Sequence, residues 1–237
     1  MAIEQARLVS RSLRSSLLIR LEPAGSRAKI RNGTLGSLMQ LPVTRNEIRK
    51  HIRKLRIALT TAEQNLASLR LVEQFKQLAE LTQAKNVALY LANDGEINPE
   101  LAIQWCWKNS INTYVPVLHP FTKGQLLFLK LTPTTELIAN KYGILEPKLS
   151  VCNIIPVAEL DVIFTPLVAF DVHGHRLGMG GGYYDRTLAP FIDGHGPQAI
   201  GIAHDCQQLS LLPTEEWDVP LNKIVTPNKT WNWSLSP

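Results

Sequence analysis

The fold is decided by NVALYLANDGEINPELAIQWCWKNSINTYVPVL, residues 86–118. Its start, NVALYLA (86–92), is a short apolar run of the length expected for a buried strand, and TYVPVL (113–118) predicts a second strand. NPELAIQWCWKN (98–109) between them has the pattern of a helix. Strands that alternate with helices are typical of an α/β domain, in which a largely parallel sheet is covered on both faces.

Two amphipathic helices are predicted before this segment. Thr44 is followed three residues later by Glu47, the pattern of a capping box, and apolar residues at helical spacing continue this helix to about Ala58. A second helix restarts with Thr61 and Glu63 and has an apolar stripe of its own.

Further strands are predicted after residue 118, in QLLFLK (125–130), LDVIFTPLVAF (160–170) and QAIGIAH (198–204). The second of these segments holds two apolar runs, broken by Thr165 and Pro166. We therefore predict one α/β domain over residues 44–237.

The basic charge of the chain lies in its first 43 residues. The 237 residues carry a net charge of +5 at pH 7, and residues 1–43 hold seven basic and two acidic side chains. Residues 44–237 are therefore neutral, with 18 side chains of each sign. A neutral domain gives no electrostatic reason to expect nucleic-acid binding.

Residues 1–43 are predicted to be a basic, disordered extension. Their Arg, Ser and Leu content resembles a targeting presequence, but we favour a flexible tail or a start assigned too far upstream of Met39. No apolar run approaches the ~20 residues needed to cross a bilayer. Cys106, Cys152 and Cys206 are scattered, which suits buried free thiols in a reducing cytoplasm better than disulfides or a zinc site.

A glycine-rich stretch, RLGMGGGYYDR (176–186), is the strongest candidate for a ligand site. It follows two strand-like runs and precedes a predicted helix, and backbone N–H groups in such a turn can bind an anion. No Gly-Lys-Ser/Thr ending is present, and the glycine spacing does not match a dinucleotide fingerprint. By spacing alone, a plain turn between elements is an equal alternative.

The side chains around the glycines favour phosphate and a metal ion. Arg176 and Arg186 flank the loop with planar donors that suit phosphate oxygens. Asp185 is a hard oxygen ligand where a nucleotide's Mg²⁺ would need one, although an acid at a helix start is common. For Tyr183 and Tyr184, half-buried packing is the alternative to a contact with a ligand.

Four other groups have both a functional and a structural explanation. His173 and His175 could grip zinc, but DVHGH is more typical of a hairpin tip and no third ligand is spaced nearby. Cys206 after a strand could be a nucleophile, yet such a thiol is usually packed and inert. Asp171 either aims at a site or caps a turn, and Glu96 either binds a polar ligand or lies exposed in a loop.

TPLVAFDVHGHRLGMGGGYYDR (165–186), with GEI (95–97) and EEWDVPL (215–221), is similar to the 5-formyltetrahydrofolate cyclo-ligase family, also called methenyltetrahydrofolate synthetases. The resemblance covers roughly residues 44–230, and the combined R-L-G-x-G-x-G-Y-Y-D element is specific to that family. It implies a single three-layer α/β domain with a mixed, mostly parallel sheet flanked by helices. The extension 1–43 has no counterpart in the family pattern.

The resemblance implies sites for ATP, folate and Mg²⁺. ATP is expected to contact Arg45, Arg49, Arg176, Leu177, Gly178, Met179, Gly180, Gly181, Gly182, Tyr183 and Tyr184. The folate is expected to contact Leu91, Glu96, Met179, Gly180, Gly181, Gly182 and Tyr183. Asp185 and Asp218 would bind Mg²⁺, and Arg176 and Asp185 would be the catalytic residues. The family has lysine where Arg45 stands, so the charge is kept but the geometry differs.

The reaction implied by the resemblance converts 5-formyltetrahydrofolate and ATP into 5,10-methenyltetrahydrofolate, ADP and phosphate. The γ-phosphoryl group would pass to the formyl oxygen, and N10 would then close the ring and expel phosphate. We expect a cytoplasmic, monomeric enzyme of one-carbon metabolism, without nucleic-acid or membrane partners. The alternatives are a nucleotide- or RNA-binding relative without turnover and another ATP-dependent phosphotransferase.

Overall fold

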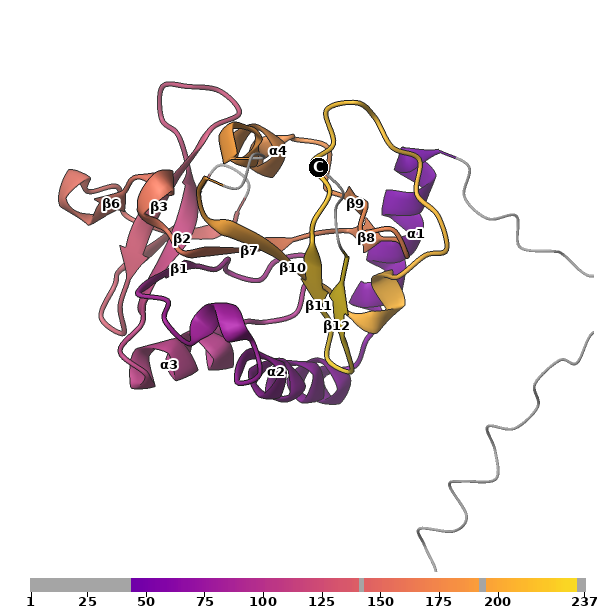
Figure 1. Cartoon of the computed structure of the whole chain (residues 1–237), viewed down its shortest axis with the longest axis horizontal. Coiled ribbons are helices and arrows are strands. Elements are labelled where there is room, and N and C mark those ends of the chain that lie inside the picture. Colours follow the sequence, from indigo (N-terminus) through magenta and orange to yellow (C-terminus); the bar gives the residue numbers. More distant parts are fainter. Residues whose placement is uncertain (1–43, 141–142, 192–194, 234–237) are drawn as a thin grey trace, which may run out of the picture. The chain divides into compact units, whose positions relative to one another are not determined.

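The computed structural model describes residues 44–140, 143–191 and 195–233, which Figure 1 shows as a coloured ribbon. These residues belong to one compact unit. The extension 1–43 and the suggested start at Met39 lie outside the described residues, so the predicted domain boundary stays a prediction. No helix in the described part of the chain is long and apolar enough to span a membrane.

Eight strands of the described chain form a mixed sheet in the spatial order β12-β11-β10-β7-β1-β2-β3-β6. Their bounds are β1 Asn86–Ala88, β2 Asn112–Leu118, β3 Leu126–Leu131, β6 Ile154–Ile155, β7 Val162–Pro166, β10 Gln198–Ile202, β11 Lys223–Val225 and β12 Thr230–Asn232. The five central strands, β11 to β2, are parallel, while β12, β3 and β6 add antiparallel edges. Two hairpins stand apart, formed by β4 Leu137–Ala139 with β5 Leu145–Pro147 and by β8 Ala169–Phe170 with β9 Arg176–Leu177.

Helices cover both faces of the sheet (Figure 1). They are α1 Arg45–Ile57, α2 Thr61–Phe75, α3 Glu100–Lys108 and α4 Tyr183–Leu188. Neighbouring strand residues point to opposite faces. In β7, Phe164 packs in the core under α2 and α3, where its ring stacks on Phe75 with centroids 4.3 Å apart. Its neighbour Ile163 packs in a second core beside Leu188 of α4. The predicted three-layer α/β fold is confirmed.

The first helix packs on the β8–β9 hairpin and has the predicted capping box. α1 packs against the β8–β9 hairpin, where Ile48 and Ile52 share a small core with Leu177. The capping box of Thr44 and Glu47 is present, and α1 ends at Ile57, close to the predicted Ala58.

The second helix begins at Thr61, as predicted. The residue before α2 is Thr60, and it forms the capping box with Glu63. Thr61 is therefore the first helical residue and Glu63 the third, which is the spacing of a capping box.

Two strand predictions are corrected. β1 ends at Ala88 rather than at residue 92, because the chain leaves the sheet to form a turn over residues 93–96. Thr165 and Pro166 do not break the strand but are the last two residues of β7. The missing N–H of Pro166 is tolerated at this strand end, and the break falls at the next two residues.

Candidate active site

The candidate site lies at the carboxyl ends of β1 and β7. These strands are neighbours in the sheet, but the chain continues from β1 to β2 on one side and from β7 to β10 on the other. α/β proteins commonly bind ligands at such a switch point. Glu96 follows β1, and the glycine-rich stretch follows β7 through the β8–β9 hairpin.

The glycine-rich stretch forms the loop between β9 and α4. Gly182 directly precedes α4 with φ at +63°, a left-handed conformation that favours glycine. Arg186 of α4 donates from Nε to the Gly124 carbonyl oxygen at 2.9 Å and from Nη2 to the Gly181 carbonyl oxygen. Arg186 therefore ties the loop to the β2–β3 connection through Nε and Nη2, and its suggested role on phosphate stays a prediction.

A buried ion pair holds the base of this loop. Arg176, which is 6% exposed, donates from Nη1 to the Val219 carbonyl oxygen at 2.6 Å and from Nη2 to Asp185 Oδ1. Burial lowers the pKa of Arg176, and the charges of Asp185 and Asp218 act against this change. Asp185 Oδ2 receives no hydrogen bond from the described residues and is free to meet a cation.

Arg45 and Asp218 form a second ion pair beside the first. Arg45 donates from Nη1 to Oδ2 at 2.8 Å and from Nη2 to Oδ1 at 2.9 Å, and Asp218 Oδ2 also accepts from the Glu215 backbone N–H at 2.9 Å. The hydrogen bond to Asp218 raises the pKa of Arg45, to which Asp185 adds a weaker effect. The two predicted metal carboxylates thus belong to one charge cluster. The described chain contains no group of three or more His, Cys, Asp or Glu side chains that could hold a metal.

Arg49 lies one helical turn after Arg45 and faces the glycines. Its Nε donates to the Gly178 carbonyl oxygen at 2.8 Å, and its Nη1 donates to Asn46 Oδ1 at 2.7 Å. Its Nη2 lies 3.3 Å from the point that a Cβ on Gly180 would occupy, and it makes no hydrogen bond within the described residues. The structure therefore brings Arg49 into contact with the predicted loop, while Arg45 lies within electrostatic reach of Asp185.

Glu96 is largely buried, which corrects the exposed-loop alternative. Only 15% of its side-chain surface is exposed, and its Oε2 accepts from the Asn93 backbone N–H at 3.2 Å. Burial raises the pKa of Glu96 to about 7, although Arg56 nearby lowers it. Its charge also raises the pKa of Tyr184, after the larger effect of burial. Tyr184 belongs to the glycine-rich stretch, so the Glu96 carboxylate lies within electrostatic range of that stretch.

The side chains of three other predicted contact residues differ in how exposed they are. The Leu177 side chain is 1% exposed and packs in the core under α1. Leu91 is partly buried and packs against the core on the α2 and α3 side. Met179 is 53% exposed and projects from the loop.

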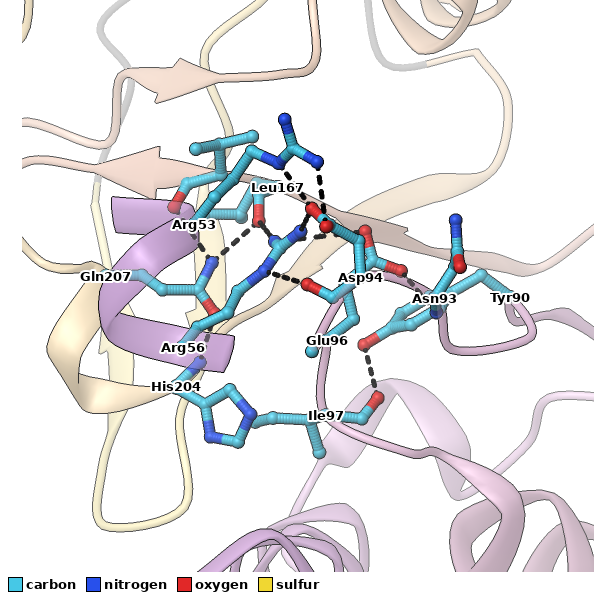
Figure 2. A network of polar contacts seen from close by, with 12 residues as sticks. Arg53, Arg56, Tyr90, Asn93, Asp94, Glu96, Ile97, Leu167, His204 and Gln207 are labelled. Carbon is cyan, nitrogen blue, oxygen red and sulfur yellow. Dashed lines mark hydrogen bonds and ion pairs between the residues drawn. The ribbon is translucent and has the colours of Figure 1, made fainter. Parts of the chain in front are cut away.

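Sequence reasoning missed a network of polar side chains around Glu96, which Figure 2 shows. Its centre is Arg56 of α1, which is completely buried. A signal was present, because Ile48, Ile52 and Arg56 continue one buried stripe at a spacing of four residues. An arginine in such a stripe requires buried partners, and here these include Asp94 and the Leu167 carbonyl oxygen.

The other sequence candidates have structural roles. Asp171 caps the β8–β9 turn by accepting from the backbone N–H groups of His173 and His175 at 2.9 and 3.1 Å, and its carboxylate lies 3.0 Å from the His175 ring nitrogen. Burial raises the pKa of Cys206, so this thiol is not activated. Cys106 is buried as expected, whereas Cys152 is exposed, contrary to the expectation of buried thiols.

An arginine-flanked glycine loop and a buried carboxylate at the switch point define a ligand-binding α/β domain. The model of the 5-formyltetrahydrofolate cyclo-ligase family matches residues 42–227. A 5-formyltetrahydrofolate cyclo-ligase of Haemophilus influenzae is 51% identical over 181 residues, which are 76% of this chain and 96% of that protein. The Escherichia coli K12 cyclo-ligase is 46% identical over 182 residues, 77% of this chain and all of that protein.

Solved structures agree with these relatives. The 5,10-methenyltetrahydrofolate synthetase of Aquifex aeolicus superposes with a TM-score of 0.68 at 28% identity, covering 81% of this chain and 96% of that one. The chain belongs to the 5-formyltetrahydrofolate cyclo-ligase family, and its activity is that of a cyclo-ligase.

Proposed function

We propose that this enzyme converts 5-formyltetrahydrofolate and ATP into 5,10-methenyltetrahydrofolate, ADP and phosphate between the glycine-rich loop and Glu96. The observation that carries this assignment is the electrostatic proximity of the two halves: Tyr184 of α4, at the end of the glycine-rich stretch, lies within the electrostatic reach of both Glu96 and Arg176. This proximity supports adjacent sites for the phosphates and the folate ring, as a transfer between two bound substrates requires.

The ATP phosphates are assigned to the loop and its arginines. Glycines 178, 180, 181 and 182 leave the backbone N–H groups accessible to phosphate oxygens. Arg49 contributes the guanidinium nitrogen that is free of described partners. Arg45 replaces the family lysine and is held in place by Asp218.

The residues present fit one Mg²⁺ ion bound mainly through Asp185. Mg²⁺ usually keeps several waters and takes one or two carboxylates together with substrate phosphates, so a cluster of three acids is not needed. Asp185 offers its free Oδ2. Both oxygens of Asp218 already accept hydrogen bonds from Arg45, so Asp218 is the less available of the two carboxylates. When bound, the ion would neutralise charge on the transferring phosphoryl group.

The pterin ring is assigned to Glu96. The ring carries N–H donors on its amino-pyrimidinone edge, and an ionised carboxylate can accept two of them at once. Leu91 and residues 179–183 would line the rest of the folate, as the family resemblance implies.

The chemistry requires positioning and charge neutralisation more than a proton acceptor. A formamide carbon is a poor electrophile and its oxygen a poor leaving group, so transfer of the γ-phosphoryl group to the formyl oxygen solves both problems. A new P–O bond forms as the bond to ADP breaks. N10 then attacks the formyl carbon, loses its proton and expels phosphate. Arg176 would stabilise the transferring charge, and holding both substrates in line contributes ~7–11 kcal/mol toward the barrier.

The direct test follows methenyl absorbance with 5-formyltetrahydrofolate and MgATP. Asp185→Asn should lose most Mg²⁺-dependent activity while its circular dichroism spectrum stays unchanged. Glu73→Gln, which neutralises an exposed acid of α2, is the control and should keep full activity. Absence of turnover in the folded wild type, or full activity of Asp185→Asn, would contradict the assignment. ADP release with a different acceptor would point to another phosphotransferase.

We also propose that the enzyme acts as a monomer in the cytoplasm, where reducing conditions suit its free cysteines. Light scattering on the purified protein measures the oligomeric state, and a stable dimer would refute this part of the proposal.

A further inference from the structure

Arg56 is the centre of the polar network in Figure 2. Its side chain is completely buried. It donates from Nε to the Asp94 carbonyl oxygen at 2.8 Å, from Nη2 to Asp94 Oδ2 at 2.8 Å and from Nη1 to the Leu167 carbonyl oxygen at 3.3 Å. Nη1 also lies 3.9 Å from Glu96 Oε1. One guanidinium therefore contacts both the main chain and the side chain of the segment that carries Glu96.

That segment is a tight turn which Arg56 holds in place. Asp94 and Gly95 have φ values of +52° and +74°, and the Glu96 N–H donates to the Asn93 carbonyl oxygen at 3.0 Å, as in a type I′ turn. A Cβ on Gly95 would lie 3.1 Å from the Arg56 carbonyl oxygen, so α1 and the turn approach closely.

The same network reaches two further strand ends. The Leu167 oxygen follows β7 and also accepts from Gln207 Nε2 at 2.6 Å. Gln207 Oε1 in turn accepts from the backbone N–H of His204, just after β10, at 2.8 Å. The position of Glu96 is therefore set relative to the carboxyl ends of β1, β7 and β10.

The charges around Glu96 are unequal. Arg53 and Arg56 both pair with the carboxylate of Asp94, but of the two arginines only Arg56 also lies within ion-pair distance of Glu96. Burial and Arg56 together lower the pKa of His204 to about 4, so His204 adds no charge at neutral pH. The other groups that face Glu96 are the hydroxyls of Tyr90 and Tyr184, whose pKa values burial raises, so both stay neutral.

We propose that Arg56 is a positioning residue for substrate binding: with Asp94 it fixes the 93–96 turn and supplies the counter-charge for the Glu96 carboxylate that receives the pterin. The inference rests on the proposed role of Glu96. Arg56 itself need not touch either substrate.

The experiment measures KM for 5-formyltetrahydrofolate, KM for ATP and the pH midpoint of kcat/KM for the folate. Arg56→Gln should raise KM for the folate about tenfold or more, since charged hydrogen bonds contribute ~1.5–3 kcal/mol. It should leave KM for ATP within about twofold and move the pH midpoint upward, because loss of the positive charge disfavours ionised Glu96. Arg56→Lys keeps the charge, so it should restore the midpoint more than the KM.

Asp94→Asn gives the opposite signature, and it replaces a side chain that is 18% exposed instead of a fully buried one. Its KM for the folate should also rise, but the midpoint should move downward, because Asp94 itself raises the pKa of Glu96. Arg53→Gln is the matched control: it breaks an equivalent two-bond pair with Asp94 at 2.6 and 2.8 Å, yet Arg53 is 41% exposed and has no contact with Glu96. It should leave both values unchanged.

The outcomes separate this inference from the function on which it rests. If Glu96→Gln leaves KM for the folate unchanged, the proposed role of Glu96 fails. If Glu96→Gln raises that KM while the Arg56 and Asp94 variants leave KM and midpoint at wild-type values, the positioning role alone is refuted. Midpoint shifts in the same direction for Arg56→Gln and Asp94→Asn would also refute it. Should Arg56→Gln fail to fold, Asp94→Asn against Arg53→Gln decides.

Discussion

Replacing Glu96 by glutamine is expected to stabilise the folded protein at alkaline pH, although it removes a proposed substrate contact. Glu96 is largely buried, and the protein raises the pKa of its carboxyl from the ordinary 4.5 to about 7. The folded state thus binds the proton more tightly than the unfolded state. An acid of this kind makes stability fall as pH rises from 4.5 through about 7, after which the loss is constant.

The size of the effect follows from the two pKa values. One pKa unit corresponds to about 1.4 kcal/mol, and integrating the proton uptake gives a loss in unfolding free energy of about 2.5 kcal/mol between pH 5 and pH 8. Glutamine keeps the shape and the acceptor for the Asn93 N–H but cannot ionise. The stability difference between Glu96→Gln and wild type should therefore move by about 2.5 kcal/mol in favour of the variant over this range.

Urea unfolding of both proteins at pH 5, 6, 7 and 8 checks this prediction. All other titrating groups are shared, so their contributions cancel in the difference between the two proteins. If the stability difference between the variant and the wild type is the same at pH 5 and pH 8, the raised pKa of Glu96 is refuted. Loss of turnover in Glu96→Gln would show that the Glu96 carboxylate lowers the stability of the folded protein but is needed for activity.

Two further substitutions probe the framework of the site, and one labelling experiment probes the core. In Arg45→Lys the side chain cannot keep both hydrogen bonds to Asp218, so KM for ATP should rise several-fold with little change in kcat. Equal KM values in the variant and the wild type would mean that the two-bond pair has no role in ATP binding. Gly182→Ala should destabilise the protein by ~1–3 kcal/mol, since φ is +63° and the new Cβ would lie 2.8 Å from Arg186 Nη1; an unchanged urea midpoint would contradict this. The Cys106 thiol, whose pKa burial raises to about 12, should resist a thiol reagent at pH 8 until the protein unfolds, as mass spectrometry can test; rapid native labelling would oppose it.

The sheet and its helices could be predicted because local patterns and burial agree. The apolar runs predicted at 86–92 and 160–170 contain the central parallel strands β1 and β7, and the capping box at Thr44 starts α1. The errors fall where tertiary structure overrides a local signal. β1 is cut short by the turn that places Glu96, and Pro166 is accepted because it stands at a strand end.

The site could be predicted less completely than the fold. The glycine loop with its arginines was visible as a motif, and the structure brings these residues together. The burial of Glu96 was not visible, and neither were its electrostatic neighbours Arg56 and Tyr184, which come from other segments. The hydrogen-bond partners of the arginines could not be predicted either. The sequence does not show that Arg186 donates to backbone oxygens, or that Nη2 of Arg49 has no hydrogen-bond partner among the described residues.

The pair of Arg45 and Asp218 joins positions 173 residues apart, and this separation bears on how the enzyme loses activity. Asp218 lies in an irregular segment between η6 (Asp205–Gln207) and β11, held by few regular backbone bonds. Such a segment opens at a lower free energy than the parallel strands beneath it. Mild denaturant should therefore detach Asp218 from Arg45 while the sheet is intact, so inactivation comes before global unfolding and local opening limits the working range of the enzyme.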